Sequence, residues 1–236
     1  MDRYHKDAYF ASSLESLVKI KDKKEFVTKA RKLEDYIYSK NNPFLAFRLA
    51  LELDLRGFKT SRLENYIINC NDSRYILKFA REIKRANIKK LQEAIIRQGT
   101  TLQIAKFGCF IRGAQRSIIE DIIVESAHAK SAYFYLKYVK FCNFNKLKPI
   151  ILKSKKPRYL FALAKLIKNK KELDLIQDLI INGTSFMYMR LFAIHIHGAD
   201  IKRIEDRIIK SGNIDEMKKF HSKIPSDRMK KIALLF

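Results

Sequence analysis

Aliphatic residues recur along this chain at the spacing of one face of an α-helix. The clearest example carries Ile201, Ile204 and Ile208, which are three or four residues apart. Gly198 precedes this segment and Gly212 follows it, and glycine commonly marks the turns at helix ends. The stretch from 198 to 213 therefore predicts a complete helix between two turns.

The same unit recurs upstream with a period of about 28 residues. Its first anchor is an aliphatic residue followed four and five positions later by two more aliphatics, and we place it at Leu63, Leu91, Ile118, Leu147, Leu175 and Ile204. A second anchor, usually a small residue after an aromatic one, keeps the same phase at Ala50, Ala80, Gly108, Leu136, Ala164 and Ala193. Two columns in one phase predict a repeat made of helix A, a turn, helix B and a second turn.

A helical hairpin this short cannot bury its own apolar face, whereas a row of hairpins can. We therefore predict an all-α fold, an α-solenoid of about six two-helix repeats, rather than a helical bundle with accidental periodicity. Residues 1–42 are predicted to form an N-terminal helical cap, 43–213 the repeats and 214–236 C-terminal capping helices, all in one continuous domain. The turn signal SKNNP at 39–43 marks the first boundary. We expect the apolar end, Leu234 to Phe236, to pack on the last layer or on another chain.

The charge is strongly basic. Lys and Arg number 49 against 25 acids, which gives a net charge of +24. This excess favours a polyanionic partner, since a lysine-rich composition alone does not explain so few acids. The three cysteines are far apart, and the chain shows neither a secretion signal at its start nor an apolar run of bilayer length. We therefore expect an intracellular protein with no membrane segment and no disulfide framework.

Cations form two columns on either side of the turn from helix A to helix B. The first, at the end of helix A, contains Lys84, Arg112, Lys140 and Lys168, followed by His197. The helix dipole alone favours cations there. The second, just before helix B, contains Arg62, Lys89, Lys90, Arg116, Lys146, Lys202 and Arg203, and the loop residues Lys170 and Lys171 add to it. Cations at a helix N-terminus oppose the dipole, so the second column favours phosphate binding along one edge.

Acids such as Glu64, Glu120 and Glu205 fall in the first turns of helix B and are interpreted as structural. The dense aromatic segment around Tyr133 and Tyr138 could stack on bases, but its spacing favours the core. We predict no catalytic residue, metal or cofactor, because no Walker loop, GxSxG, HExxH or paired CxxC motif occurs. The closest enzymatic alternative is a DNA glycosylase built on HEAT-like repeats.

The segments GADIKRIEDRIIKSGN and FAREIKRANIKKLQEAIIRQG resemble short α-helical repeats found in phage and giant-virus proteins. The resemblance covers about residues 44–213 and implies an α-solenoid, with no established activity or site. Ile119, Lys148 and Ile176 depart from the pattern, which has a glutamate after the first anchor. The period is shorter than that of ankyrin, TPR, pentatricopeptide or HEAT units, so a base-per-repeat code is not expected.

Two functional hypotheses follow from these patterns. The first is a non-enzymatic protein that binds DNA or RNA through a basic edge, mostly without reading the sequence. The alternative is a solenoid that binds an acidic protein partner, as a viral factor or a subunit of a larger assembly, in part through its apolar C-terminus.

Overall fold

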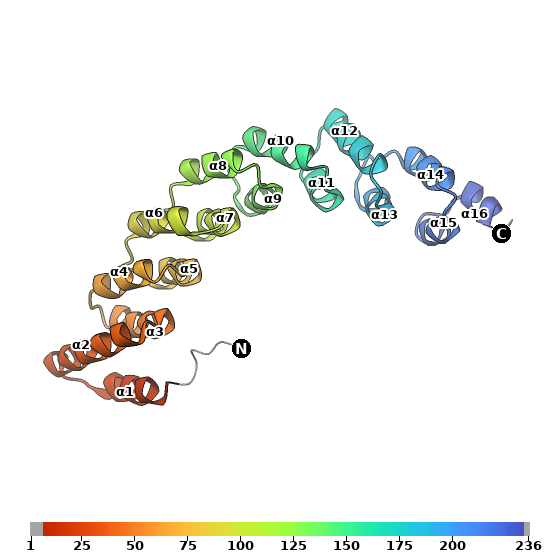
Figure 1. Cartoon of the computed structure of the whole chain (residues 1–236). Helices are drawn as coiled ribbons and strands as arrows, with labels where there is room; N and C mark the ends of the chain where they lie inside the picture. The colour runs from red at the N-terminus through yellow and green to blue at the C-terminus, as the bar shows by residue number, and fades with distance from the viewer. Residues whose placement is uncertain (1–6, 234–236) are drawn as a thin grey trace. The chain divides into compact units, whose positions relative to one another are not determined.

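The structure, a computed structural model, describes residues 7–233, and these residues form helices and turns without any strand (Figure 1). The prediction of an all-α fold is confirmed. The chain divides into two compact units, one ending at Ile122 and the other beginning at Ile123, so the division falls inside α8 (Arg116–Glu125). Within the described part, no helix is both long and apolar enough to cross a bilayer.

The first unit begins with two helices, α1 and α2, within the segment 1–42 that was predicted to be helical. Asn41 adopts a left-handed conformation after α2, and the Asn42 side chain accepts the amide of Phe44 at 3.0 Å, so the predicted turn at 39–43 is confirmed. The helices of this unit before α8 are α1 (Ala8–Lys19), α2 (Lys23–Lys40), α3 (Pro43–Leu55), α4 (Ser61–Asn69), α5 (Ser73–Glu82), α6 (Ile88–Gln98) and α7 (Thr101–Phe110).

The second unit continues the same alternation and ends in two short helices. Phe220 on the first of these is fully buried, whereas the predicted packing of Leu234 to Phe236 lies outside the described residues. The helices of this unit after α8 are α9 (Ala129–Tyr138), α10 (Phe144–Ser154), α11 (Pro157–Ala164), α12 (Lys170–Ile181), α13 (Phe186–His195), α14 (Ile201–Lys210), α15 (Ile214–His221) and α16 (Asp227–Ala233).

Within each unit, successive A helices pack on one another. In the first unit α3 packs on α5 and α5 on α7, and in the second α9 packs on α11 and α11 on α13. The B helices α4, α6, α10 and α12 each pack on their own helix A and on the next one. This packing between neighbours along the chain is the arrangement expected of stacked hairpins.

The second anchor explains why the A helices come close together. Ala50, Ala80 and Ala164 are buried, and a side chain this small lets the neighbouring helix approach. Phe79 and Phe107, which precede two of the small residues, have no exposed surface and fill the space beside them. The second anchor therefore packs as the spacing predicted.

The first anchor is wrong by one residue in two repeats. Ile118 and Leu175 are 43% and 50% exposed, whereas the next residues, Ile119 and Ile176, have no exposed surface. Two adjacent aliphatics made the pattern ambiguous, and packing against the neighbouring helices selects the second of each pair. The buried anchors are therefore Leu63, Leu91, Ile119, Leu147, Ile176 and Ile204.

The corrected phase shows a polar column that joins one repeat to the next. The residue after the anchor is Glu64 in α4, Gln92 in α6 and Gln177 in α12, and all three are buried. Their side-chain oxygens accept the backbone N–H of Asn87, Gln115 and Asp200 at 2.9, 2.7 and 2.9 Å, respectively. The two glutamines also donate to the carbonyls of Gln115 and Asp200, at 3.3 and 2.8 Å.

Each of these bonds spans 23 residues and ends at the residue before the next helix B. Because a buried polar side chain must find a hydrogen-bond partner, the column fixes where each A-to-B turn sits on the preceding repeat. Burial raises the pKa of the Glu64 carboxyl, while the Asn87 amide and the Lys90 charge act in the opposite direction. The interpretation of Glu64 as structural is consistent with these contacts.

Candidate nucleic-acid interface

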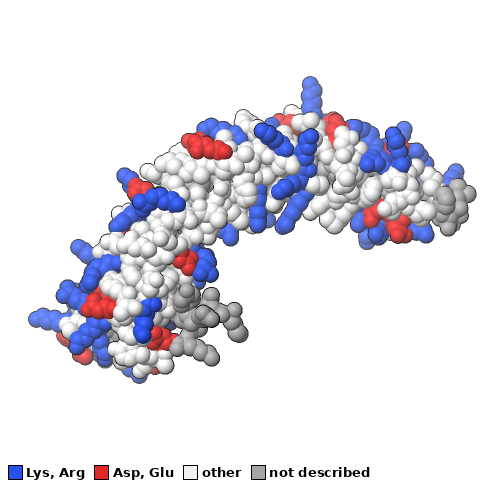
Figure 2. Space-filling view, viewed as in Figure 1, with Lys and Arg blue, Asp and Glu red and all other residues white. Residues whose placement is uncertain are grey.

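The predicted cations all lie at A-to-B turns or in the first turn of a helix B, and all are exposed. We call these sets the basic edges, one in each unit. In the first unit the basic edge contains Lys84, Lys89, Lys90, Arg112 and Arg116, and in the second Lys140, Lys146, Lys168, Lys170, Lys171, Lys202 and Arg203. Figure 2 shows Lys and Arg scattered over the visible surface, where they outnumber the acids.

The residues of the first cation column lie just beyond helix A rather than in its last turn. Helix α5 ends at Glu82, buried Ile83 is its C-cap, and Lys84 follows. The backbone amide of Lys84 donates to Asp54 Oδ2 of the preceding repeat at 2.9 Å, and this hydrogen bond fixes the backbone at Lys84. Arg112 and Lys140 likewise follow a buried C-cap residue.

Lys168 differs from the rest of its column, because α11 ends early. The helix stops at Ala164, and Lys168 lies directly before Asn169, the N-cap of α12. The four cations of the column therefore occupy equivalent positions in the repeat, but they do not all lie at the same distance from a helix end.

The second column lies inside the first turn of helix B, so its prediction as a segment before the helix is wrong. Helix α6 already begins at Ile88, which makes Lys89 and Lys90 its second and third residues, and the same holds for Lys202 and Arg203 in α14. The helices begin earlier than the apolar pattern indicated because Asn or Asp side chains cap them. The acids Glu120 and Glu205 consequently lie one turn further in than predicted.

These caps occupy one of the amides that a phosphate would use. Asn87, Asn143 and Asp200 accept the third amide of their helices, those of Lys90, Lys146 and Arg203, at 3.1 Å in each case. The expectation that free helix amides and side chains point at one phosphate therefore needs correction. The side chains, rather than free helix amides, are therefore the candidate anion-binding groups of the basic edges.

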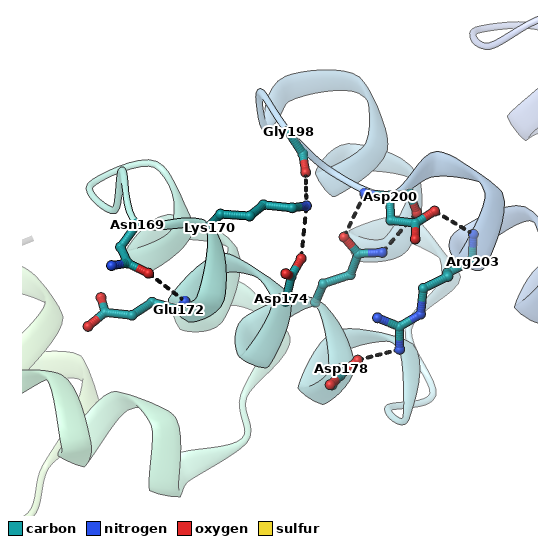
Figure 3. Close-up of polar contacts among 9 residues, drawn as sticks. Asn169, Lys170, Glu172, Asp174, Asp178, Gly198, Asp200 and Arg203 are labelled. Carbon is teal, nitrogen blue, oxygen red and sulfur yellow. Dashed lines mark hydrogen bonds and ion pairs between the residues drawn. The ribbon is translucent and has the colours of Figure 1, made fainter.

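Some cations of the basic edges join neighbouring repeats instead of facing only solvent. Lys170 Nζ lies 2.9 Å from Asp174 Oδ1 and donates to the Gly198 carbonyl at 2.5 Å, and Arg203 pairs with Asp178 (Figure 3). The Asp178 carboxylate raises the pKa of Arg203. In the first unit Lys90 Nζ donates to Asn65 Oδ1. Each of these three cations therefore contacts the neighbouring repeat.

Seven other cations of the basic edges have side chains available to a partner. Within residues 7–233, no acid or other side-chain partner accompanies the side chains of Lys84, Lys89, Arg112, Lys140, Lys168, Lys171 and Lys202.

The basic edge of the first unit also contains a cleft, which the sequence pattern missed. It has a volume of about 260 Å³, and its lining includes Lys59, Asn65, Arg85 and Lys90. Arg85 donates to the Gly57 carbonyl one repeat earlier, and Gly57 has a positive φ of 80° that favours glycine. Lys59 and Arg85 fall outside the two columns because the search required one fixed position per repeat.

Other candidate chemistry is sparse. No cluster of three or more His, Cys, Asp or Glu side chains with metal-binding geometry occurs in residues 7–233. In the aromatic segment of the second unit, Tyr135 is fully buried as predicted, whereas Tyr138 and Phe141 are 45% and 94% exposed. Comparisons with protein-family models, curated proteins and solved structures give no match to this chain.

Proposed function

We propose that this protein is a non-enzymatic helical-repeat protein that binds nucleic acid through its basic edges. The observation that carries the proposal is the recurrence, in both units, of exposed Lys and Arg side chains at A-to-B turns without an acidic partner. Because these side chains meet no carboxylate in the structure, binding a phosphate breaks no existing ion pair. The net charge of +24 adds a general attraction for polyanions.

The expected mode of binding is contact with the phosphate backbone. Lysine offers a flexible point charge, which suits phosphates but does not select a base. The affinity should therefore depend little on sequence and fall steeply with salt, because each phosphate contact releases counterions. The resemblance to phage and giant-virus repeats and an intracellular setting remain part of the proposal.

The test compares two variants that lose the same charge. The edge variant changes Lys84, Arg112, Lys140 and Lys168 to glutamine. The control variant changes to glutamine four exposed cations at the end of helix B or in the B-to-A turn that follows it, Arg97, Lys153, Lys156 and Lys210. Binding of random-sequence duplex DNA and single-stranded RNA is measured by fluorescence anisotropy at several salt concentrations.

We expect the edge variant to lose affinity and to show a salt slope shallower by up to about 3.6 on duplex DNA, since each of the four lost phosphate contacts removes about 0.9 from it. The control variant should retain most of the slope. Equal slopes for the two variants would refute the edge as the binding site. Recovery of a stoichiometric acidic protein after nuclease treatment of the native source would favour the protein-binding alternative.

A further inference from the structure

A groove crosses the exposed surface of the A helices in the second unit and extends to the turn between α11 and α12. Its volume is about 430 Å³, within the range of ligand-binding clefts. We call it the aromatic groove. It is lined by Tyr133 and Lys137 of α9, Arg158, Phe161 and Ala162 of α11, Lys165 and Leu166 after α11, and Tyr188 and Leu191 of α13.

One aromatic ring from each helix A lies in this groove. The rings of Phe161 and Tyr188 have centroids 6.1 Å apart at 53°, and Tyr133 contacts the ring of Tyr159 at 5.8 Å. These residues are half-buried, so each ring packs on one side and leaves part of its surface open. Since the rings already contact neighbouring rings, a flat ligand would stack on their open surfaces and not between them.

The charge around the groove has one sign. Helices α9, α11 and α13 contain no Asp or Glu, and the acids of this unit's helices occur on α8, α12, α14, α15 and α16. Lys137, Arg158 and Lys165 are exposed, and the Lys165 ammonium lies 4.5 Å from the centre of the Phe161 ring. Because this ammonium lies over the Phe161 ring, a base that stacks there has to move the lysine aside, and a cation next to an aromatic ring is suited to an anion attached to a flat base.

We propose that the aromatic groove binds single-stranded nucleic acid, with bases stacked on its rings and phosphates beside its cations. A duplex keeps its bases stacked on one another, so only a single strand can present base faces to these side chains. The occupant differs in this respect from a ligand of the basic edges, which need only phosphates. An acidic peptide would satisfy the cations but would leave the three rings without a flat partner.

The corresponding surface of the first unit is a useful comparison. A groove of about 300 Å³ there lies between α5 and α7 and includes Lys78, Arg81 and Lys106. Its lining contains one aromatic ring, that of Phe110. It is basic without a series of rings, so we assign base stacking to the second unit.

The test measures binding of the full chain to labelled oligo(dT) of about 20 nucleotides and to a duplex of equal length, which exceeds the site size of known single-strand modules. The ring variant changes Tyr133, Phe161 and Tyr188 to leucine, which keeps apolar packing and removes the flat face. The charge variant changes Lys137, Arg158 and Lys165 to glutamine. Tyr9→Leu serves as control, because Tyr9 is 61% exposed in the other unit.

We expect the ring variant to bind oligo(dT) about tenfold more weakly and the duplex within about twofold of the original protein. The charge variant, whose changes are all at exposed positions, should reduce the salt slope on oligo(dT) by about 2. It gives an independent answer if the ring variant fails to fold. Tyr9→Leu should behave as the unchanged protein.

Unchanged oligo(dT) binding in both groove variants would overturn the proposal. So would a poly-glutamate peptide whose binding is lost in the ring variant while oligo(dT) binding is kept. The edge variant in the same assay separates the two proposals. Loss of duplex binding there with intact groove effects supports both, whereas groove effects without any edge effect leave only the groove proposal standing.

Discussion

Replacing Gln177 by leucine removes both hydrogen bonds between α12 and the turn before α14 while keeping a side chain of similar size. Gln177 is 1% exposed, and its amide accepts from the Asp200 N–H at 2.9 Å and donates to the Asp200 carbonyl at 2.8 Å. A hydrogen bond in a folded protein contributes about 0.5–1.5 kcal/mol net. Asp200 is half-buried, so water can reach its freed groups only in part.

We therefore expect Gln177→Leu to lower the free energy of unfolding by about 2 kcal/mol, the sum of two such bonds with a small additional desolvation cost. The assay is urea unfolding followed by far-UV circular dichroism, combined with hydrogen exchange at the Asp200 amide. That amide should exchange faster in the variant, because its acceptor is gone. Gln92→Leu should have the same local effect at Gln115 in the first unit.

Gln177→Glu refines the test. A glutamate keeps the acceptor for the Asp200 amide but loses the donor, and it buries a charge, so the loss should grow as the pH rises above the carboxyl pKa. The proposed connection between repeats would be refuted if Gln177→Leu had the same unfolding midpoint as the unchanged protein and its Asp200 amide exchanged at the original rate.

Further predictions concern the anchor phase and the Glu64 carboxyl. Ile176→Ala should cost about 2–5 kcal/mol in urea unfolding, whereas Leu175→Ala should change stability by less than about 0.5 kcal/mol, because only the first residue is buried; equal effects would contradict the corrected phase. Burial raises the pKa of Glu64 above 4.5. Between the pKa of the unfolded state and the raised pKa of the native state, the native protein keeps the Glu64 proton and the unfolded chain has lost it. The free energy of unfolding therefore falls as the pH rises through this range. Glu64→Gln should keep the acceptor for the Asn87 amide and reduce the decline of the unfolding midpoint as the pH rises through the raised pKa of Glu64; an unaltered pH profile would count against this role.

The buried anchor of a repeat could be predicted from the sequence where only one aliphatic residue fitted the apolar pattern. Around Ile204 the neighbouring positions are charged, so a single residue fits the buried face, and it is fully buried. At Ile118 and Leu175 an aliphatic residue follows directly, and helical spacing cannot choose between neighbours that lie about 100° apart on the helix. Only the contact with the adjacent helices selects Ile119 and Ile176.

The sequence predicted which residues form the basic edges, but it did not predict which of them pair with a neighbouring repeat. Sequence spacing placed Lys170 and Arg203 in the same class as Lys168 and Lys202. The structure separates them, because Lys170 contacts the Gly198 carbonyl of the next A-to-B turn and Arg203 pairs with Asp178 of α12. A charge pattern along one helix contains no information about acceptors supplied by the next repeat.

The aromatic groove shows the same limit. Tyr133, Phe161 and Tyr188 were at spacings that also suit a core, and the sequence favoured that interpretation for Tyr133.

The sequence by itself determined the all-α fold, the repeat length and the strong positive charge, because helix periodicity and composition are local properties of the chain. Tertiary structure decided which of two adjacent aliphatics is buried, which cations remain without a partner, and which aromatic rings keep an open face. Each of these depends on atoms supplied by a neighbouring repeat about 28 residues away, whose position is set by packing and by buried hydrogen bonds such as those of Gln177.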